Sequence, residues 1–162
     1  MRHHEERLPA VMALIVLLAA PAVAQEVSPE EADNAVREIQ QSHIDANVPP
    51  EADFDRLLRR DLAAYFASID GSTSEISYEL LRRGPTQSGI AYPKFYAWVS
   101  VRREGHPNHE GAVRLAAINR ERFEIIQFVD QSEARRDPSG LDQIFPPPVA
   151  AAIRARVGNF AP

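Results

Sequence analysis

The sequence contains no cysteine, and this absence excludes several classes of protein at once. A chain without cysteine has no disulfide framework, no thiolate-bound zinc or iron–sulfur centre, no cysteine nucleophile and no lipoprotein-type lipid attachment. An excess of basic residues is also lacking, since 18 Lys+Arg stand against 23 Asp+Glu, for a formal net charge of −5. This balance argues against binding to nucleic acid. We therefore expect no cofactor and no nucleic-acid partner.

Catalytic sequence templates are missing as well. The chain has no Gly-x-Ser-x-Gly elbow, no phosphate-binding glycine loop with Lys and Ser/Thr, no His-Glu-x-x-His and no dinucleotide fingerprint. Asp53 and Asp55 form a close carboxylate pair, but both fall at the start of a predicted helix, where negative charge is stabilised by the helix dipole. We therefore nominate no catalytic residue, and a binding role is favoured over an enzymatic one.

The main apolar run, over residues 11–20, is about half the roughly 20 residues that a membrane-spanning helix needs. Residues 1–24 instead have the three parts of an export signal: a start with two arginines, this apolar run, and the small-residue site Ala22-Val23-Ala24. We expect cleavage before Gln25 and an exported protein, periplasmic or secreted, with no stable membrane span after cleavage. The alternatives are an uncleaved membrane tether and a buried N-terminal helix.

Two helices are predicted next. Ser28 and Glu31 can form a capping box around Pro29 at the first helical position. Apolar-face residues then recur at helical spacing until Asn47-Val48-Pro49-Pro50 ends the helix, namely Ala32, Ala35, Val36, Ile39 and His43. The second helix is predicted over residues 51–68 and has a wide apolar stripe, formed by Phe54, Leu57, Leu58, Leu62, Tyr65 and Phe66.

From residue 76 onward the apolar period changes to that of strands, which we predict up to residue 80 and over residues 94–103, 112–119 and 123–129. Short connections favour an antiparallel meander. A last helix is predicted over residues 148–157. The fold class is therefore α+β, with two N-terminal helices, a four-stranded antiparallel meander sheet and a C-terminal helix. These elements form a single domain over residues 25–162, with a first helix and linker (25–50), a helix plus sheet (51–130) and a loop with the closing helix (131–162).

The order of helix and strands over residues 50–130 resembles the cystatin-like and nuclear-transport-factor-two-like fold group. Members of this group curl an antiparallel sheet around a helix, so the resemblance implies a curved sheet. The stretch from Gly89 to Trp98, together with Phe145-Pro146-Pro147, also resembles exported bacterial proteins of uncharacterised function. Neither resemblance supplies catalytic residues.

Strand alternation predicts one apolar core face of the sheet, formed by Ile76, Tyr78, Leu80, Phe95, Ala97, Val99, Val101, Val113, Leu115 and Ala117. The opposite face also carries large apolar residues, and the fourth strand is apolar on both sides, which does not suit a sheet with one solvated face. The C-terminal helix, a second copy of the chain, or a ligand would each explain this pattern. We predict a ligand or partner surface there, formed by Tyr96, Trp98, Ile126 and Phe128.

This aromatic surface implies a homodimer or another protein partner. The alternative is a pocket in a curved sheet that binds or converts a small hydrophobic or anionic molecule. Such a pocket would open at a basic rim, because the meander brings five basic residues to one edge: Arg82, Arg83, Lys94, Arg120 and Arg122. Nearby glutamates would neutralise part of this charge.

The loop over residues 104–110 holds His106 and His109 beside two glutamates, which are ligand types for zinc or copper. A spacing of three places two rings together on a helix, but Pro107 and the loop context remove that geometry. A solvated hairpin loop is favoured, and we predict no metal site.

Overall fold

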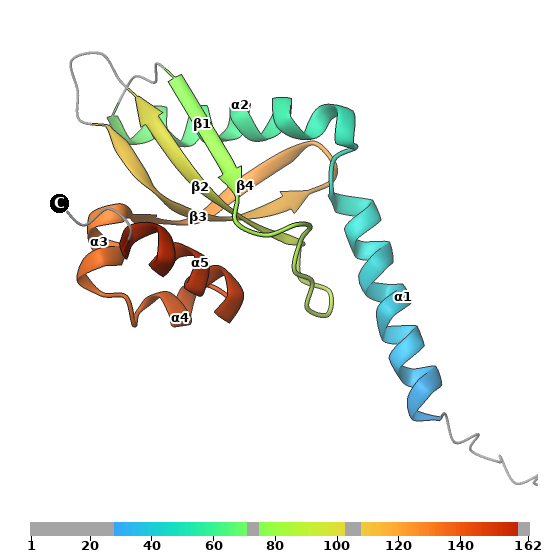
Figure 1. Cartoon of the computed structure of the whole chain (residues 1–162). Coiled ribbons are helices and arrows are strands. Elements are labelled where there is room, and N and C mark those ends of the chain that lie inside the picture. The colour runs from blue at the N-terminus through green and yellow to red at the C-terminus, as the bar shows by residue number, and fades with distance from the viewer. Residues whose placement is uncertain (1–27, 71–74, 103–107, 159–162) are drawn as a thin grey trace, which may run out of the picture.

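The computed structural model describes residues 28–70, 75–102 and 108–158. Its sheet lies between two helical layers (Figure 1). Helix α2 (Glu51–Asp70) covers one face, and the other face carries α3 (Gln131–Arg136), α4 (Leu141–Ile144) and α5 (Pro147–Gly158). Helix α1 (Pro29–Asn47) extends away from both layers. The predicted α+β class is confirmed.

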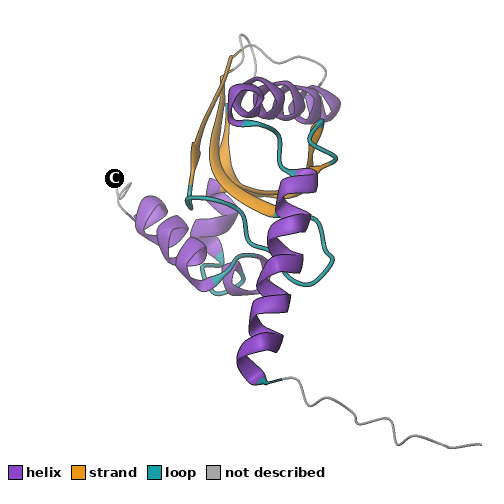
Figure 2. Cartoon of the chain, turned by 90° about the vertical axis from the view of Figure 1, so that its right-hand side faces the viewer, coloured by secondary structure: helices purple, strands orange, loops and turns teal. Residues whose placement is uncertain are grey.

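The sheet is the predicted antiparallel meander, with strand order β1-β2-β3-β4. The strands lie close to their predicted ranges: β1 (Glu75–Leu80), β2 (Lys94–Arg102), β3 (His109–Ile118) and β4 (Arg122–Asp130). Figure 2 shows that the sheet curves around α2. The curvature brings side chains from all four strands toward one helix.

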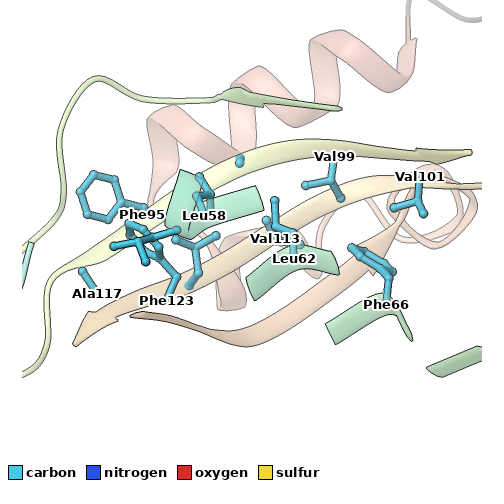
Figure 3. Packing of buried hydrophobic residues seen from close by; sticks show 12 residues of the cluster. Leu58, Leu62, Phe66, Phe95, Val99, Val101, Val113, Ala117 and Phe123 are labelled. Carbon is cyan, nitrogen blue, oxygen red and sulfur yellow. The ribbon is translucent and has the colours of Figure 1, made fainter. Parts of the chain in front are cut away.

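The main hydrophobic core lies between α2 and this concave face (Figure 3). All ten side chains predicted for the core face belong to it. Leu58, Leu62 and Phe66 of α2 are fully buried against the strands. Near the first turn of the helix, Phe54 makes edge-to-face contacts with Phe95 and Phe123, at ring-centroid distances of 5.1 and 4.9 Å. The core thus fixes both ends of α2 on the sheet.

A β-bulge in β4 changes the direction of its side chains. Arg114 pairs with Gln127 and Leu115 pairs with Ile125, so Ile126 is the extra residue. Beyond an extra residue, each side chain of the strand points to the face opposite to the one that simple alternation predicts. Phe128 therefore faces α2, together with Ile125, and its ring meets Phe66 at a centroid distance of 5.1 Å. The prediction that Ile126 and Phe128 share the second face is wrong for this reason.

The second face of the sheet is covered by the protein's own C-terminal helices. Tyr96 and Trp98 lie beneath them with only 4 % and 3 % of their surface exposed. The residues that cover them come mainly from the three short helices, namely Ala134, Leu141, Phe145, Val149, Ala150, Ile153 and Val157. Of the three explanations for the apolar second face, the structure shows the C-terminal helices, although more of them than the single one predicted.

Helix ends follow local hydrogen-bonding chemistry. The capping box at α1 is present: Glu31 N–H donates to Ser28 Oγ and Ser28 N–H donates to Glu31 Oε2, at 3.2 and 2.9 Å. Helix α3 was not predicted, although Asp130 caps it by accepting from Ser132 N–H at 2.8 Å. Arg135 and Arg136 occupy its last turn. Asp130 with Glu133 is the sequence signal that marks this helix start.

Candidate functional site

The four residues predicted as a ligand or partner surface do not form one surface. Tyr96 and Trp98 are buried on the second face, Phe128 is partly buried on the opposite face, and Ile126 is 44 % exposed on β4. Trp98 is also held in place by polar contacts. Its indole N–H donates to Glu110 at 2.9 Å, and the Arg156 guanidinium, which is bonded to Glu79, lies 5.3 Å from the ring centroid. These contacts assign Trp98 a structural role.

The predicted basic rim is spread over one end of the sheet. Arg82 and Arg83 are exposed after β1, and Arg120 is exposed in the turn before β4. Arg122 pairs with Glu124 at 3.9 Å. Lys94 is half-buried, and burial, followed by the charge of Arg114, lowers its pKa while Glu124 opposes the shift. Anion binding by this rim stays a prediction.

Of the two histidines that we considered as metal ligands, His109 lies among the described residues and His106 does not. His109 begins β3 and stacks on Phe66, with ring centroids 5.8 Å apart. Within residues 28–70, 75–102 and 108–158, no group of three or more His, Cys, Asp or Glu residues is arranged to hold a metal ion.

A different feature dominates the surface at the joint between α1 and α2. It is an open, apolar groove with a volume of about 510 Å³, which we name the joint groove. Residues from the joint, the start of α2, the end of β1, the following loop and β2 line it: Val48, Pro49, Glu51, Phe54, Asp55, Leu80, Gly84, Pro85 and Phe95. Sequence reasoning missed the groove because its walls come from segments far apart in the chain.

A hydrogen-bonded clamp fixes the joint itself. The side chain of Asn47, which is buried, accepts from Asn119 N–H at 3.1 Å and donates to His43 O at 2.9 Å. Its carbonyl accepts from Arg120 N–H at 2.8 Å. Pro49 and Pro50 follow, and proline fixes the backbone further. The direction in which α1 leaves the groove is therefore set by the β3–β4 turn.

One side of the groove carries an ordered ionic cluster. Asp55 accepts from Arg59 Nε at 2.9 Å and from the Tyr78 hydroxyl at 2.9 Å. These bonds, with Arg59 first, lower the pKa of Asp55. Burial, followed by the bond to Asp55, raises the pKa of Tyr78 to about 12. Asp55 is consequently ionised at neutral pH and is bonded to both Arg59 and Tyr78 at the side of the groove.

Helix α1 presents the second unusual surface. Val36 and Ile39 are each 52 % exposed, although they belong to the apolar stripe that the sequence predicts. Of the stripe residues, only His43, near the joint, is half-buried. The N-terminal half of α1 extends beyond the rest of the described chain (Figure 1). An apolar groove and an uncovered apolar helix face thus meet at one joint.

Comparison of the chain with family models, curated proteins and solved structures found no match. Among the described helices, none is long and apolar enough to cross a membrane. The function has to be inferred from the joint groove and the exposed stripe of α1.

Proposed function

We propose that this chain is an exported binding protein that recognises a protein partner through the joint groove and the exposed stripe of α1. The apolar groove at the joint, together with the uncovered Val36 and Ile39 further along the helix that leaves this joint, is the observation that supports this function. Contiguous apolar surface is costly to leave in water, and where proteins keep it exposed it usually marks an interaction site. The proposed site therefore lies at the joint between α1 and α2, and not on the second sheet face where the sequence predicted it.

The chemistry of the groove supports binding rather than catalysis. Among the described residues that line it, the ionisable ones are Glu51 and Asp55. Asp55 is already bonded to Arg59 and Tyr78, and its lowered pKa makes it a poor proton acceptor at neutral pH. The remaining walls are apolar side chains, glycine and proline, which supply contact area.

A small amphiphilic molecule is the second candidate for the groove. Its volume falls within the roughly 300–1,000 Å³ that is typical of ligand pockets. Arg82 and Arg83 directly precede the lining residues Gly84 and Pro85, so a ligand with an apolar body and an anionic head would find complementary charge there. A protein partner remains our main proposal because α1, which carries the uncovered apolar face, leaves the fold at the joint that borders this groove.

The groove is tested by fluorescence titration with N-phenylnaphthylamine, an uncharged apolar dye. We expect the parent chain to bind the dye, and Pro85→Asp to weaken binding by about 10-fold or more, because a charge in the apolar wall would have to be desolvated. Ile126→Asp is the matched control, since it adds the same charge at an exposed apolar residue of β4. Dye binding should be unchanged in this control.

Two outcomes would refute the groove as a recognition site. One is a parent chain that does not bind the dye even when it is diluted to concentrations at which it is monomeric. The other is equal loss of binding in Pro85→Asp and Ile126→Asp, because binding would then not be located in the groove. The uncharged dye ensures that repulsion between like charges does not produce the effect.

Export is the other part of the proposal, and it is supported by the three-part pattern of residues 1–24, which lie outside the described residues. We expect the protein recovered from outside the cytoplasm to begin at Gln25. Mass spectrometry of the intact protein measures this directly. Recovery of a chain that still carries residues 1–24 would support the membrane-tether alternative.

A further inference from the structure

We propose that the partner recognised by the joint groove is a second copy of this chain, and that the two copies exchange their α1 helices. Each α1 lies with its apolar stripe in the joint groove of the other chain. This inference rests on the proposed function and names its partner. Three features of the described residues support it. They are the apolar character of both the stripe and the groove, the opposite charges of α1 and the groove border, and the fixed direction of α1.

The apolar surfaces are complementary in kind. The stripe of α1 repeats at helical spacing along one face, through Ala32, Ala35, Val36 and Ile39. The groove offers an apolar lining that includes Phe54, Leu80 and Phe95. A helix that places residues three and four apart into such a groove is a common mode of recognition. Docking would cover the exposed half of the stripe and the open groove together.

The charges select between two ways of pairing. Helix α1 has five acidic residues and a single basic residue, Arg37. Packing of α1 against α1 would place two acidic helices side by side, which is unfavourable. The groove of the other copy has two ionisable lining residues, Glu51 and Asp55, and Asp55 is already bonded to Arg59. Arg82 and Arg83 are exposed directly before the lining residue Gly84 and give the groove a basic border. Attraction between an acidic helix and this basic border favours exchange into the groove.

The geometry of the joint favours exchange between copies. The Asn47 clamp and the two following prolines fix the direction of α1 as it leaves the groove, and its N-terminal half extends into solvent (Figure 2). The 19 residues of α1 span about 28 Å at the usual helical rise. The stripe is therefore held away from the groove of its own chain. Reciprocal exchange about a two-fold axis fills both grooves and closes the assembly.

The first test is sedimentation velocity on the exported chain, beginning at Gln25, over a range of concentrations. We expect a dimer, and we expect Ile39→Asp to weaken dimerisation by about 10-fold or more, because it places a charge in the docked stripe. Asn34→Asp is the matched control, since Asn34 is also exposed on α1 but bonds to Arg37 on the polar side, at 2.7 Å. Dimerisation of this control should equal that of the parent.

The second test locates α1 in the dimer by disulfide cross-linking, which the absence of native cysteine makes clean. Chains with Val36→Cys are mixed with chains carrying Pro85→Cys and are oxidised mildly. Exchange predicts that the mixed disulfide between the two kinds of chain forms fastest. Faster formation of the disulfide between two Val36→Cys chains would overturn the proposal, because it would show α1 paired with α1.

The two proposals fail in distinguishable ways. A chain that stays monomeric at every concentration and still loses dye binding in Pro85→Asp overturns the exchange but supports the groove as a recognition site. A chain that forms dimers unaffected by Ile39→Asp also overturns the exchange. Absence of both dimer and dye binding refutes the two proposals together.

Discussion

Replacement of Trp98 by alanine is expected to lower the free energy of unfolding by about 3–5 kcal/mol, as for other large aromatic residues removed from a core. The side chain is almost completely buried between β2 and the C-terminal helices. Its removal leaves a cavity, deprives Glu110 of an N–H donor and deprives Arg156 of the ring on which it lies. Urea unfolding of the variant and the parent, followed by circular dichroism, measures the difference.

Trp98→Phe weighs packing against the polar contact, because phenylalanine keeps an aromatic ring and most of the apolar volume but has no N–H to donate. We expect it to recover more than half of the lost stability. The parent and Trp98→Phe should also associate equally. A Trp98→Ala chain that unfolds like the parent but no longer associates would show that the second face is a partner surface after all.

Gly111→Ala is expected to destabilise the fold by about 3 kcal/mol or more, near the upper end of the usual cost of overpacking. A Cβ atom at this position would lie 2.2 Å from the carbonyl oxygen of Val129, 2.8 Å from Cε2 of Phe128 and 3.0 Å from Cα of Asp130. Backbone atoms cannot turn away as a flexible side chain can. The pairing of β3 with β4 would have to open where the bulged strand crosses to α3.

Gly158→Ala provides the control for this substitution. It lies at the end of α5, and a Cβ atom there would meet nothing within 4 Å. Thermal unfolding should leave this variant within about 1 kcal/mol of the parent, since alanine is the better helix former. If Gly111→Ala were as stable as Gly158→Ala, β4 would not approach β3 at Gly111 as closely as the structure describes.

Local sequence patterns were sufficient to predict most of the fold. The stripe from Phe54 to Phe66 fixed the face that α2 turns to the sheet, and strict alternation in β1, β2 and β3 identified the concave face. Both patterns repeat over many residues, so a single exception does not hide them. The capping residues Ser28 and Glu31 marked the first helix in the same direct way.

The bulge at Ile126 shows why alternation along the sequence does not predict the sheet face of every β4 side chain. Without it, Ile126 and Phe128 share one face and β4 seems apolar on both sides. With it, Phe128 joins Phe123 and Ile125 in the main core, and only Ile126 stays exposed. Nothing in the local sequence marks the extra residue, because the register depends on pairing with β3.

The candidate site depended on contacts that sequence patterns do not report. The stripe of α1 was visible in the sequence, but whether another element covers it is a property of the tertiary structure. The joint groove combines Val48, Leu80 and Phe95, which lie in three different segments. Conversely, the C-terminal helices had only a narrow apolar edge in the sequence, yet they cover Tyr96 and Trp98 almost completely.

The joint groove as a recognition site is tested most directly by the dye titration of Pro85→Asp beside Ile126→Asp. Both variants add one negative charge to an apolar position, one in the groove and the other on β4. We expect the affinity for the dye to fall in Pro85→Asp alone. Unchanged affinity in Pro85→Asp would contradict this expectation.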